Sequence, residues 1–121
     1  MKVKTFTFKY DPNFSLKRMG EEIKEAVRTG KPSVHPDRIR YADIEDIMKE
    51  MSSTRLKLFS CLVTKKPQSL YQLAQLLSRD YANVWGEAKS LAQMGIIKLE
   101  KENGRIRPIP LYERVVFDFS V

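Results

Sequence analysis

The sequence predicts a mainly helical α+β protein in which strands occupy both ends of a 121-residue chain. Three observations support this class. Apolar residues recur at helical spacing through most of residues 15–95, which indicates several amphipathic helices. Polar and apolar residues alternate near both ends of the chain, as in strands with one buried face. An Asn-Gly pair at residues 103–104 lies between two further alternating segments and predicts a hairpin.

The N-terminal residues predict a strand followed by a helix. Residues 2–10 alternate, and their aromatic side chains point to one face: Phe6, Phe8 and Tyr10. Ser15 begins a segment whose apolar residues have helical spacing: Leu16, Met19, Ile23, Ala26 and Val27. Gly30 and Pro32 end this helix, because glycine suits a helix C-terminus and proline cannot continue a helix.

A linker, an extended segment and a short helix complete this N-terminal arm. Residues 31–37 contain two prolines and predict a linker, in which we expect His35 to be solvated. Residues 38–41 predict an extended segment. Residues 43–51 predict a helix that buries four apolar side chains: Ile44, Ile47, Met48 and Met51. We expect residues 1–51 as a whole to mediate dimerisation.

Residues 52–113 predict three helices and a hairpin. The first helix follows Ser52-Ser53, the second follows Ser69, and a break at residues 78–80 leads to the third. The hairpin consists of residues 96–102 and 105–110. The apolar side chains expected in the core of the three helices are Leu56, Phe59, Leu62, Val63, Leu70, Leu73, Ala74, Leu76, Leu77, Val84, Ala88 and Leu91.

Residues 114–121 alternate again and predict a last strand. This strand and residues 2–10 are both too apolar to lie exposed as unpaired sheet edges. We therefore expect the two strands to pair with each other or across a dimer.

Three helices followed by a two-stranded hairpin are typical of a winged helix-turn-helix. In such a domain the third helix enters the major groove of DNA, and the hairpin reaches a neighbouring phosphate or the minor groove. The predicted fold is therefore a winged helix-turn-helix with an N-terminal strand–helix arm. The residues expected on the outer face of its third helix are Tyr81, Asn83, Trp85, Lys89 and Gln93.

Several motifs extend this pattern over nearly the whole chain. The third helix ends in Leu91, Gly95, Ile96 and Ile97, and the residues that follow the hairpin turn include Arg105, Arg107, Pro108, Pro110 and Tyr112. With Met19-Gly20-Glu21 in the N-terminal helix, these features resemble the MarR-like winged-helix family of predicted archaeal and bacterial DNA-binding regulators. The resemblance implies DNA binding and dimerisation. Ala82 and Gly86 stand where that family often carries a basic residue, and Gly86 suits close approach of a backbone.

Nine residues are predicted to contact DNA. Asn83 can make a bidentate contact to adenine, and Lys89 can reach guanine or a phosphate. Trp85 either stacks on a sugar or base or packs as an anchor. Ser69 either binds phosphate together with backbone amides at a helix N-terminus or belongs to a plain loop. The full set is Ser69, Arg79, Tyr81, Asn83, Trp85, Lys89, Lys101, Arg105 and Arg107.

The charge distribution favours a polyanionic partner for the second half. The chain has 22 basic and 15 acidic residues, which give a net charge of +7. Residues 52–121 carry 11 basic and 6 acidic side chains, whereas residues 1–51 carry 11 and 9. The positive surplus therefore lies mainly in the predicted winged helix.

Other classes of protein are disfavoured by what the sequence lacks. A single cysteine excludes an internal disulfide, and one cysteine with one histidine cannot form a zinc site from N and S ligands alone. Residues 1–11 do not resemble a signal peptide, and no window is apolar enough to span a membrane. We expect a cytoplasmic protein without cofactor, metal or enzymatic activity, in which Cys61 is a buried apolar residue.

These observations together predict a function in transcription. We expect a sequence-specific regulator that binds double-stranded DNA as a homodimer and represses by occupying its site. One alternative is a protein-interaction module, or an autoregulating antitoxin whose N-terminal arm binds a protein. RNA binding is less favoured, because the sequence lacks the aromatic sheet motif and the GXXG clamp of common RNA-binding domains.

Overall fold

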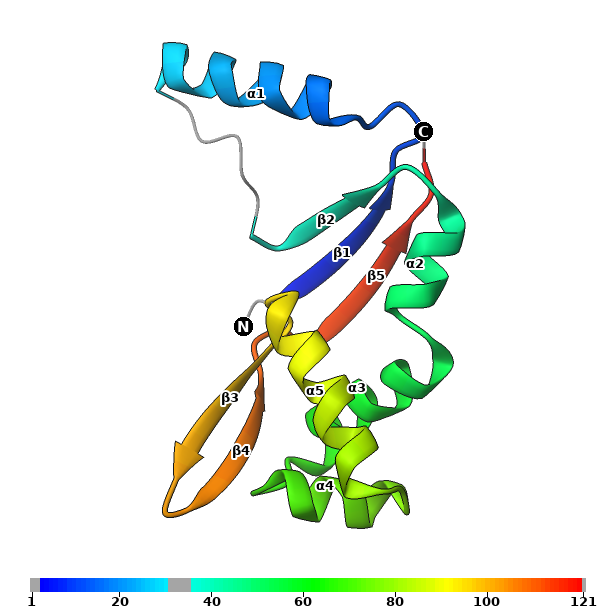
Figure 1. Ribbon diagram of the computed structural model, residues 1–121, viewed down its shortest axis with the longest axis vertical. Coiled ribbons are helices and arrows are strands. Elements are labelled where there is room, and N and C mark those ends of the chain that lie inside the picture. The colour runs from blue at the N-terminus through cyan, green and yellow to red at the C-terminus, as the bar shows by residue number, and fades with distance from the viewer. Residues whose placement is uncertain (1–2, 31–35, 121) are drawn as a thin grey trace. The chain divides into compact units, whose positions relative to one another are not determined.

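The computed structural model describes residues 3–30 and 36–120, in which five helices and five strands form a mixed α+β protein (Figure 1). The predicted linker residues 31–35 with His35, and Val121 of the last predicted strand, lie outside the described residues. No helix of the described residues is long and apolar enough to cross a membrane. The elements in order are β1 (Thr5–Tyr10), α1 (Leu16–Thr29), β2 (Arg38–Tyr41), α2 (Ile44–Glu50), α3 (Ser53–Lys65), α4 (Leu70–Leu77), α5 (Tyr81–Gln93), β3 (Ile97–Glu102), β4 (Arg105–Pro110) and β5 (Arg114–Asp118).

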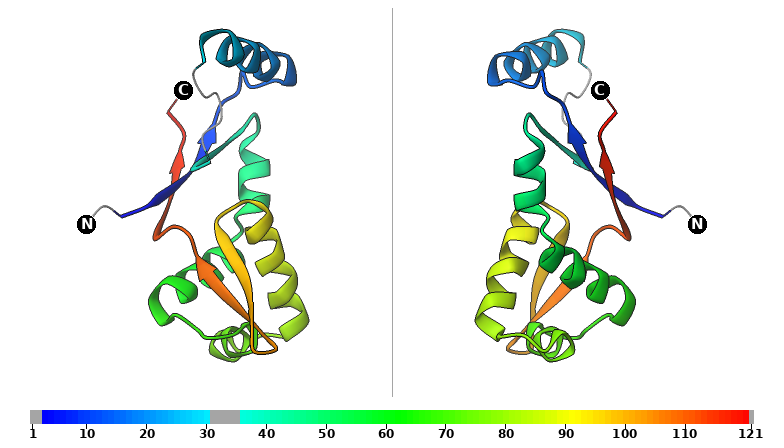
Figure 2. Two further views of the ribbon diagram at one scale, coloured as in Figure 1. Left: turned by 90° about the vertical axis from the view of Figure 1, so that its left-hand side faces the viewer. Right: turned by 90° about the vertical axis from the view of Figure 1, so that its right-hand side faces the viewer.

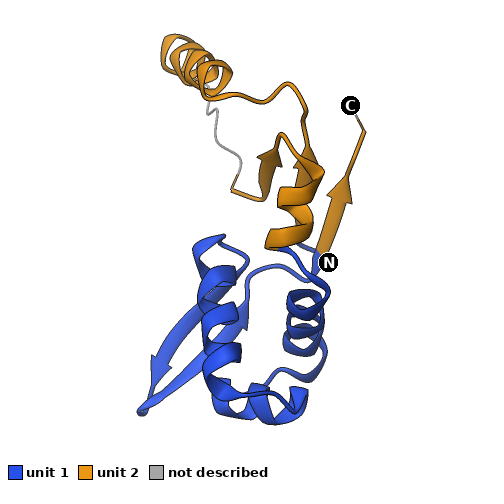
Figure 3. Ribbon diagram, turned by 45° about the vertical axis from the view of Figure 1, so that its right-hand side comes forward, with its two compact units in different colours: residues 1–4, 51–114 blue, residues 5–50, 115–121 orange. Residues whose placement is uncertain are grey.

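The chain folds into two compact units (Figure 3). Unit 1 contains residues 51–114 together with Val3 and Lys4. Unit 2 contains the described residues between Thr5 and Glu50 and those that follow Arg114. The last strand therefore belongs with the N-terminal arm, although it is separated from that arm by the whole of unit 1 in the sequence.

Unit 2 is built on a three-stranded sheet in the order β2-β1-β5. β1 and β2 are parallel, with Thr7 opposite Arg38 and Tyr10 opposite Tyr41. The arrows of β1 and β5 also point the same way (Figure 1). The expectation that the two aromatic strands pair with each other is thus confirmed within one chain.

Aromatic side chains form a row across one face of this sheet. Phe8 is fully buried, and its ring stacks on Tyr41 of β2 at 6.1 Å and on Phe117 of β5 at 5.5 Å between centroids. Phe6, also fully buried, contacts Phe8 edge to face at 5.3 Å. Because all three strands contribute a ring to this row, the row joins residues that lie more than 100 positions apart in the sequence.

The position of Tyr41 predicts a loss of stability at high pH. Burial, assisted by the negative charges of Glu50 and Asp46, raises the pKa of Tyr41 to about 12. The folded protein therefore keeps this proton while the unfolded chain loses it near pH 10, so stability is expected to fall as the pH rises from about 10 to 12. Urea midpoints measured at pH 9, 11 and 12 should show this fall in the native protein but not in Tyr41→Phe. Equal falls in both proteins would contradict the assignment.

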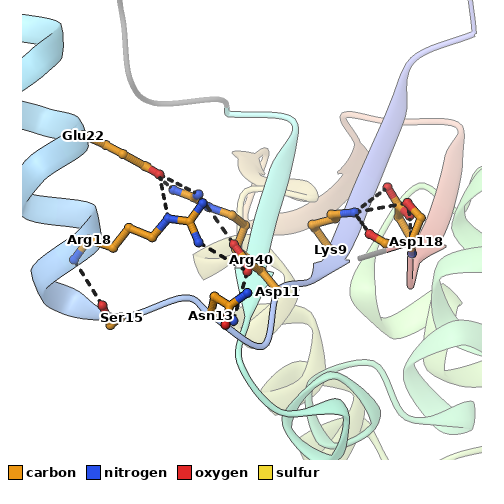
Figure 4. Close-up of polar contacts among 9 residues, drawn as sticks. Lys9, Asp11, Asn13, Ser15, Arg18, Glu22, Arg40 and Asp118 are labelled. Atoms are coloured by element: carbon orange, nitrogen blue, oxygen red, sulfur yellow. Dashed lines mark hydrogen bonds and ion pairs between the residues drawn. The ribbon is translucent and has the colours of Figure 1, made fainter.

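Helix α1 is held to the sheet by polar contacts, and no residue of the helix is buried. The Ser15 hydroxyl caps its N-terminus, and Gly30, with φ 73°, ends it in the left-handed conformation that the sequence predicted for a glycine. Glu22 of α1 accepts two hydrogen bonds from Arg40 of β2, and Asp11 lies 3.9 Å from the same guanidinium group (Figure 4). The apolar residues of α1 stay open to solvent: Leu16, Met19, Ile23 and Val27 are 80%, 38%, 45% and 80% exposed.

The predicted core of the short helix α2 was only half right. Ile47 and Met51 are buried, as expected, but Ile44 and Met48 are 41% and 49% exposed. A helix of seven residues buries only a narrow side, and within α2 that side carries Ile47, whereas Met51 follows the end of the helix and belongs to unit 1.

Unit 1 consists of α3, α4 and α5 followed by the hairpin β3–β4. Ser52, Ser69 and Asp80 cap the three helices, each by accepting a hydrogen bond from the backbone N–H three residues later. Most predicted core residues are buried, and Leu58 of α3 joins them unexpectedly. Leu56, Val63 and Leu77 are only half-buried, and the predicted burial of Leu76 was wrong, since this side chain is 48% exposed. The eight-residue α4 covers its neighbours with Leu70, Leu73 and Ala74 and leaves the opposite side in solvent.

The hairpin forms with the turn that the Asn103-Gly104 pair predicted. β3 and β4 are antiparallel, with Ile97 opposite Pro110 and Glu102 opposite Arg105. Asn103 and Gly104 form the two-residue turn, with φ values of 51° and 75°. Both turn residues therefore have the positive φ that a two-residue hairpin with matching twist requires.

Candidate nucleic-acid interface

The inner side of α5 determines which residues face solvent. Val84, Ala88 and Leu91 are fully buried at helical spacing, as the sequence predicted. Asn83 and Lys89 consequently lie on the exposed side, which also carries Gln93. The backbone N–H of Asn83 donates to the capping carboxylate of Asp80 at 3.2 Å, so the Asn83 side chain projects from a well-ordered first turn.

Trp85 and Lys89 form one amphipathic feature on α5. Trp85 is half-buried, and the Lys89 ammonium group lies 5.4 Å from the centroid of its ring. This distance is that of a cation–π contact. A half-buried tryptophan fits both the packing and the contact interpretation.

Arg79 is engaged within the protein. Its guanidinium group donates to both carboxylate oxygens of Glu87, at 2.7 and 3.0 Å, across the turn between α4 and α5. This hydrogen bonding raises the pKa of Arg79 further above its usual value. Bidentate pairing uses donors that a phosphate would otherwise bind, so Arg79 contributes to the geometry of the turn.

A cleft of about 890 Å³ brings three of the predicted contact residues together. It lies between the start of α4, the first residue of α5 and the tip of the hairpin, and Ser69, Tyr81 and Arg105 line it. In both views of Figure 2, α4 and the hairpin turn lie at the same end of unit 1. Residues from three separate elements thus face one concave surface that carries a hydroxyl, a phenol and a guanidinium group.

Sequence reasoning missed the amide-rich wall of this cleft. Gln68, Tyr71, Gln72 and Gln75 also line it, and Tyr71 is 63% exposed. The Gln72 side chain accepts a hydrogen bond from the Gln68 backbone N–H at 2.6 Å and so holds the segment before α4. A signal for this wall was present in the sequence, because glutamines at positions 68, 72 and 75 have the spacing of one helix face.

The basic residues of the hairpin differ in how far they are already paired. Arg107 lies 3.8 Å from the Glu102 carboxylate. Lys101 and Arg105 are exposed and form no ion pair among residues 3–30 and 36–120. Arg105 also lines a second, smaller cleft of about 380 Å³ with Gln68, Asn103 and the acidic Glu102. Lys101 and Arg105 are therefore the hairpin cations most open to an added anion.

Two further chemical candidates have weak support in the structure. Cys61 is half-buried in α3, and burial raises the pKa of its thiol despite the nearby Lys65. The thiol is consequently protonated at neutral pH, which disfavours a reactive thiolate. Within the described part of the chain, no cluster of three or more His, Cys, Asp or Glu side chains has an arrangement that could hold a metal ion.

The region that contains this cleft matches a known protein family. The model of the HVO_A0114 family matches residues 50–117, more than half of the chain. The chain belongs to the HVO_A0114 family. The HVO_A0114 match begins at the last residue of α2, extends into β5 and includes all nine predicted contact residues. A search of curated proteins found no match to this HVO_A0114 member.

Proposed function

We propose that unit 1 is a winged helix-turn-helix that binds double-stranded DNA. The observation that carries this proposal is the convergence of Ser69, Tyr81 and Arg105 from three elements on one cleft. The order of α3, α4, α5 and the hairpin supports it, as does the resemblance to MarR-like regulators. The net charge of +5 in residues 52–121 also favours a polyanion.

In this proposal α5 is the recognition helix. Asn83 contacts an adenine edge, and Lys89 contacts guanine or a phosphate. The exposed Ala82 and Gly86 let the helix approach the groove closely, since a Cβ at Gly86 would meet no atom within 4 Å. Arg105 and Lys101 of the hairpin bind phosphates, and Ser69 with the first backbone amides of α4 binds another.

The proposed protein is a homodimeric transcriptional regulator. Two copies present two α5 helices to half-sites about one turn of DNA apart, roughly 34 Å. Binding at such a site represses transcription by occupancy. Direct contacts to base edges in each half-site supply the sequence specificity, whereas the phosphate contacts position the protein.

A second candidate function involves a protein partner of unit 2. The observation in its favour is the apolar side of α1, where Leu16 and Val27 are each 80% exposed. An amphipathic helix with an open apolar side fits a groove on another protein. A regulator that also neutralises a protein through α1 would act as an autoregulating antitoxin.

The proposal is tested by binding to a labelled duplex from the protein's own upstream region. A scrambled duplex serves as the control, and both are titrated over a range of salt concentrations. We expect a preference of about a thousandfold for the native duplex. Equal affinity with a steep salt dependence would contradict sequence-specific regulation, because such binding reports phosphate contacts alone. Absence of binding to both duplexes at low salt would refute DNA binding and favour the second candidate.

A further inference from the structure

Strand β5 lies at an edge of the sheet in unit 2. β1 is its neighbour on one side, and no other described strand pairs with it on the other. Unprotected edges present a row of backbone donors and acceptors that can pair with another chain. The sequence of β5 is Arg-Val-Val-Phe-Asp, with opposite charges at its two ends and apolar residues between them.

The outward backbone groups of β5 follow from its pairing with β1. The Thr7 N–H donates to the Asp37 carbonyl, so the odd-numbered residues of β1 face β2 and the even-numbered ones face β5. The stacking of Phe117 on Phe8 and the ion pair of Asp118 with Lys9 place Phe117 beside Phe8, so Val116 and Asp118, on either side of Phe117, bond to Phe8. Arg114 therefore faces β1 as well, and its N–H donates to the Lys4 carbonyl at 3.2 Å, which also accepts from the Glu113 N–H at 2.9 Å. In a parallel pair every second residue makes the bonds to a given neighbour. The N–H and C=O groups of Val115 and Phe117 therefore point to the open edge.

We propose that β5 pairs antiparallel with β5 of a second copy of this chain, about a two-fold axis at Val116. In this register Val115 lies opposite Phe117 of the second copy and exchanges both backbone hydrogen bonds with it. Val116 lies opposite its own equivalent as a non-hydrogen-bonded pair, where side chains approach most closely. The interface is isologous, as in most homodimers.

The charges of β5 are self-complementary in this register. Arg114 lies opposite Asp118 of the second copy, and the same pair forms at the other end. Hydrogen bonds from Ser120, assisted by Lys9, hold the pKa of Asp118 at about 2, so the carboxylate is negative at neutral pH. Opposite charges directly across a strand pair are stabilising, whereas like charges are destabilising.

The other edge of the sheet has the reverse property. β2 has the sequence Arg-Ile-Arg-Tyr, and antiparallel self-pairing centred on Ile39 would place Arg38 opposite Arg40 of the second copy. Such a pair is repulsive. Of the two edges, the charges thus favour β5 and protect β2.

The proposed pairing also continues the packing inside unit 2. Phe117 ends the aromatic row that runs from Tyr41 through Phe8, and its new neighbour on the same face would be Val115 of the second copy. On the opposite face, the 37% exposed Val116 would be covered by its own equivalent. The two three-stranded sheets would join into one six-stranded sheet, in which β5 is no longer an open edge in either copy.

This inference specifies the dimer of the proposed function, and Val116→Lys tests it in the full-length chain. Because Val116 is exposed in the single chain, the variant is expected to fold, with an unchanged circular dichroism spectrum. The dissociation constant of the dimer, measured by sedimentation at up to about 100 μM protein, should rise at least about tenfold, because two lysines would face each other at the axis. Val116→Glu should have the same effect, and an equimolar mixture of the two variants should form a heterodimer.

The control variant is Ile23→Lys, which places the same charge on the exposed apolar side of α1. It should leave the dimer intact. A monomeric native protein, dimers that persist in Val116→Lys, failure of the mixed variants to associate, or dissociation by Ile23→Lys would each overturn the β5 interface. Salt-dependent binding of Val116→Lys to DNA separates the two proposals, because this variant keeps α5 and the hairpin. If the native protein is a dimer but does not bind DNA, only the DNA-binding proposal is refuted.

Discussion

The triple variant Asn83→Ala/Lys89→Ala/Arg105→Ala is expected to bind the upstream duplex at least about a hundredfold more weakly than the native protein. Loss of a bidentate base contact alone costs about 1–3 kcal/mol in discrimination. Removal of Arg105, which contacts a phosphate, and of Lys89, which contacts guanine or a phosphate, should also lower the slope of log affinity against log salt by about 1 to 2. Fluorescence anisotropy titrations at four or more salt concentrations measure both quantities.

A matched control for this variant is Lys24→Ala/Lys49→Ala. It also removes two positive charges, but from exposed positions of unit 2 that lie outside the proposed interface. Its affinity for the duplex should stay within about threefold of the native value, because neither lysine belongs to the proposed interface and exposed charges without a direct contact are largely screened by salt. Equal weakening by the control and the triple variant would show that net charge, not this surface, governs binding. Retention of a protein partner by the triple variant would support the antitoxin role beside DNA binding.

Phe8→Ala should produce the largest loss of stability in unit 2, about 3–5 kcal/mol in the free energy of unfolding. Phe8 is fully buried and contacts the rings of Phe6, Tyr41 and Phe117. Removal of its ring leaves a cavity where the three strands meet, in addition to the lost burial of the ring itself. Because small domains are stable by only about 5–15 kcal/mol, the loss would be a large part of the total. Urea unfolding followed by far-ultraviolet circular dichroism measures it.

Leu16→Ala provides the comparison for this prediction. Leu16 is also a large apolar residue of unit 2, but it is 80% exposed on α1. Its replacement should change the free energy of unfolding by less than about 0.5 kcal/mol. A loss below about 1 kcal/mol for Phe8→Ala would be inconsistent with the aromatic row as the core of the sheet.

Features that depend on neighbouring residues were predictable from the sequence. Ser52 and Ser69 cap helices as expected, because a cap needs only the hydroxyl and a backbone N–H three residues later. The Asn103-Gly104 turn determines the hairpin register for the same local reason. In α5 the buried spacing of Val84, Ala88 and Leu91 also identified the exposed side, since a long helix with three core contacts can face its neighbours in only one way.

Features of the candidate site that depend on distant residues were not predictable. Arg79 was predicted to contact DNA, and only the structure shows that its guanidinium donors bind Glu87, eight residues later. The spacing of the glutamines in the amide-rich wall was visible in the sequence, but the cleft that they line was not, because only the fold brings the hairpin tip to the start of α4. Neither of these contacts can be predicted from the residue spacing of one segment alone.

The sequence by itself thus determined the order of the elements, their caps and turns, and the outer side of α5, because these depend on backbone bonding within a few residues. Only the tertiary structure decided that the C-terminal strand joins the N-terminal sheet and that Leu76 and Met48 stay exposed. Only the tertiary structure brought Ser69, Tyr81 and Arg105 to one cleft. These outcomes depend on which surfaces of distant segments cover one another, and that choice is made by the packing of the whole unit.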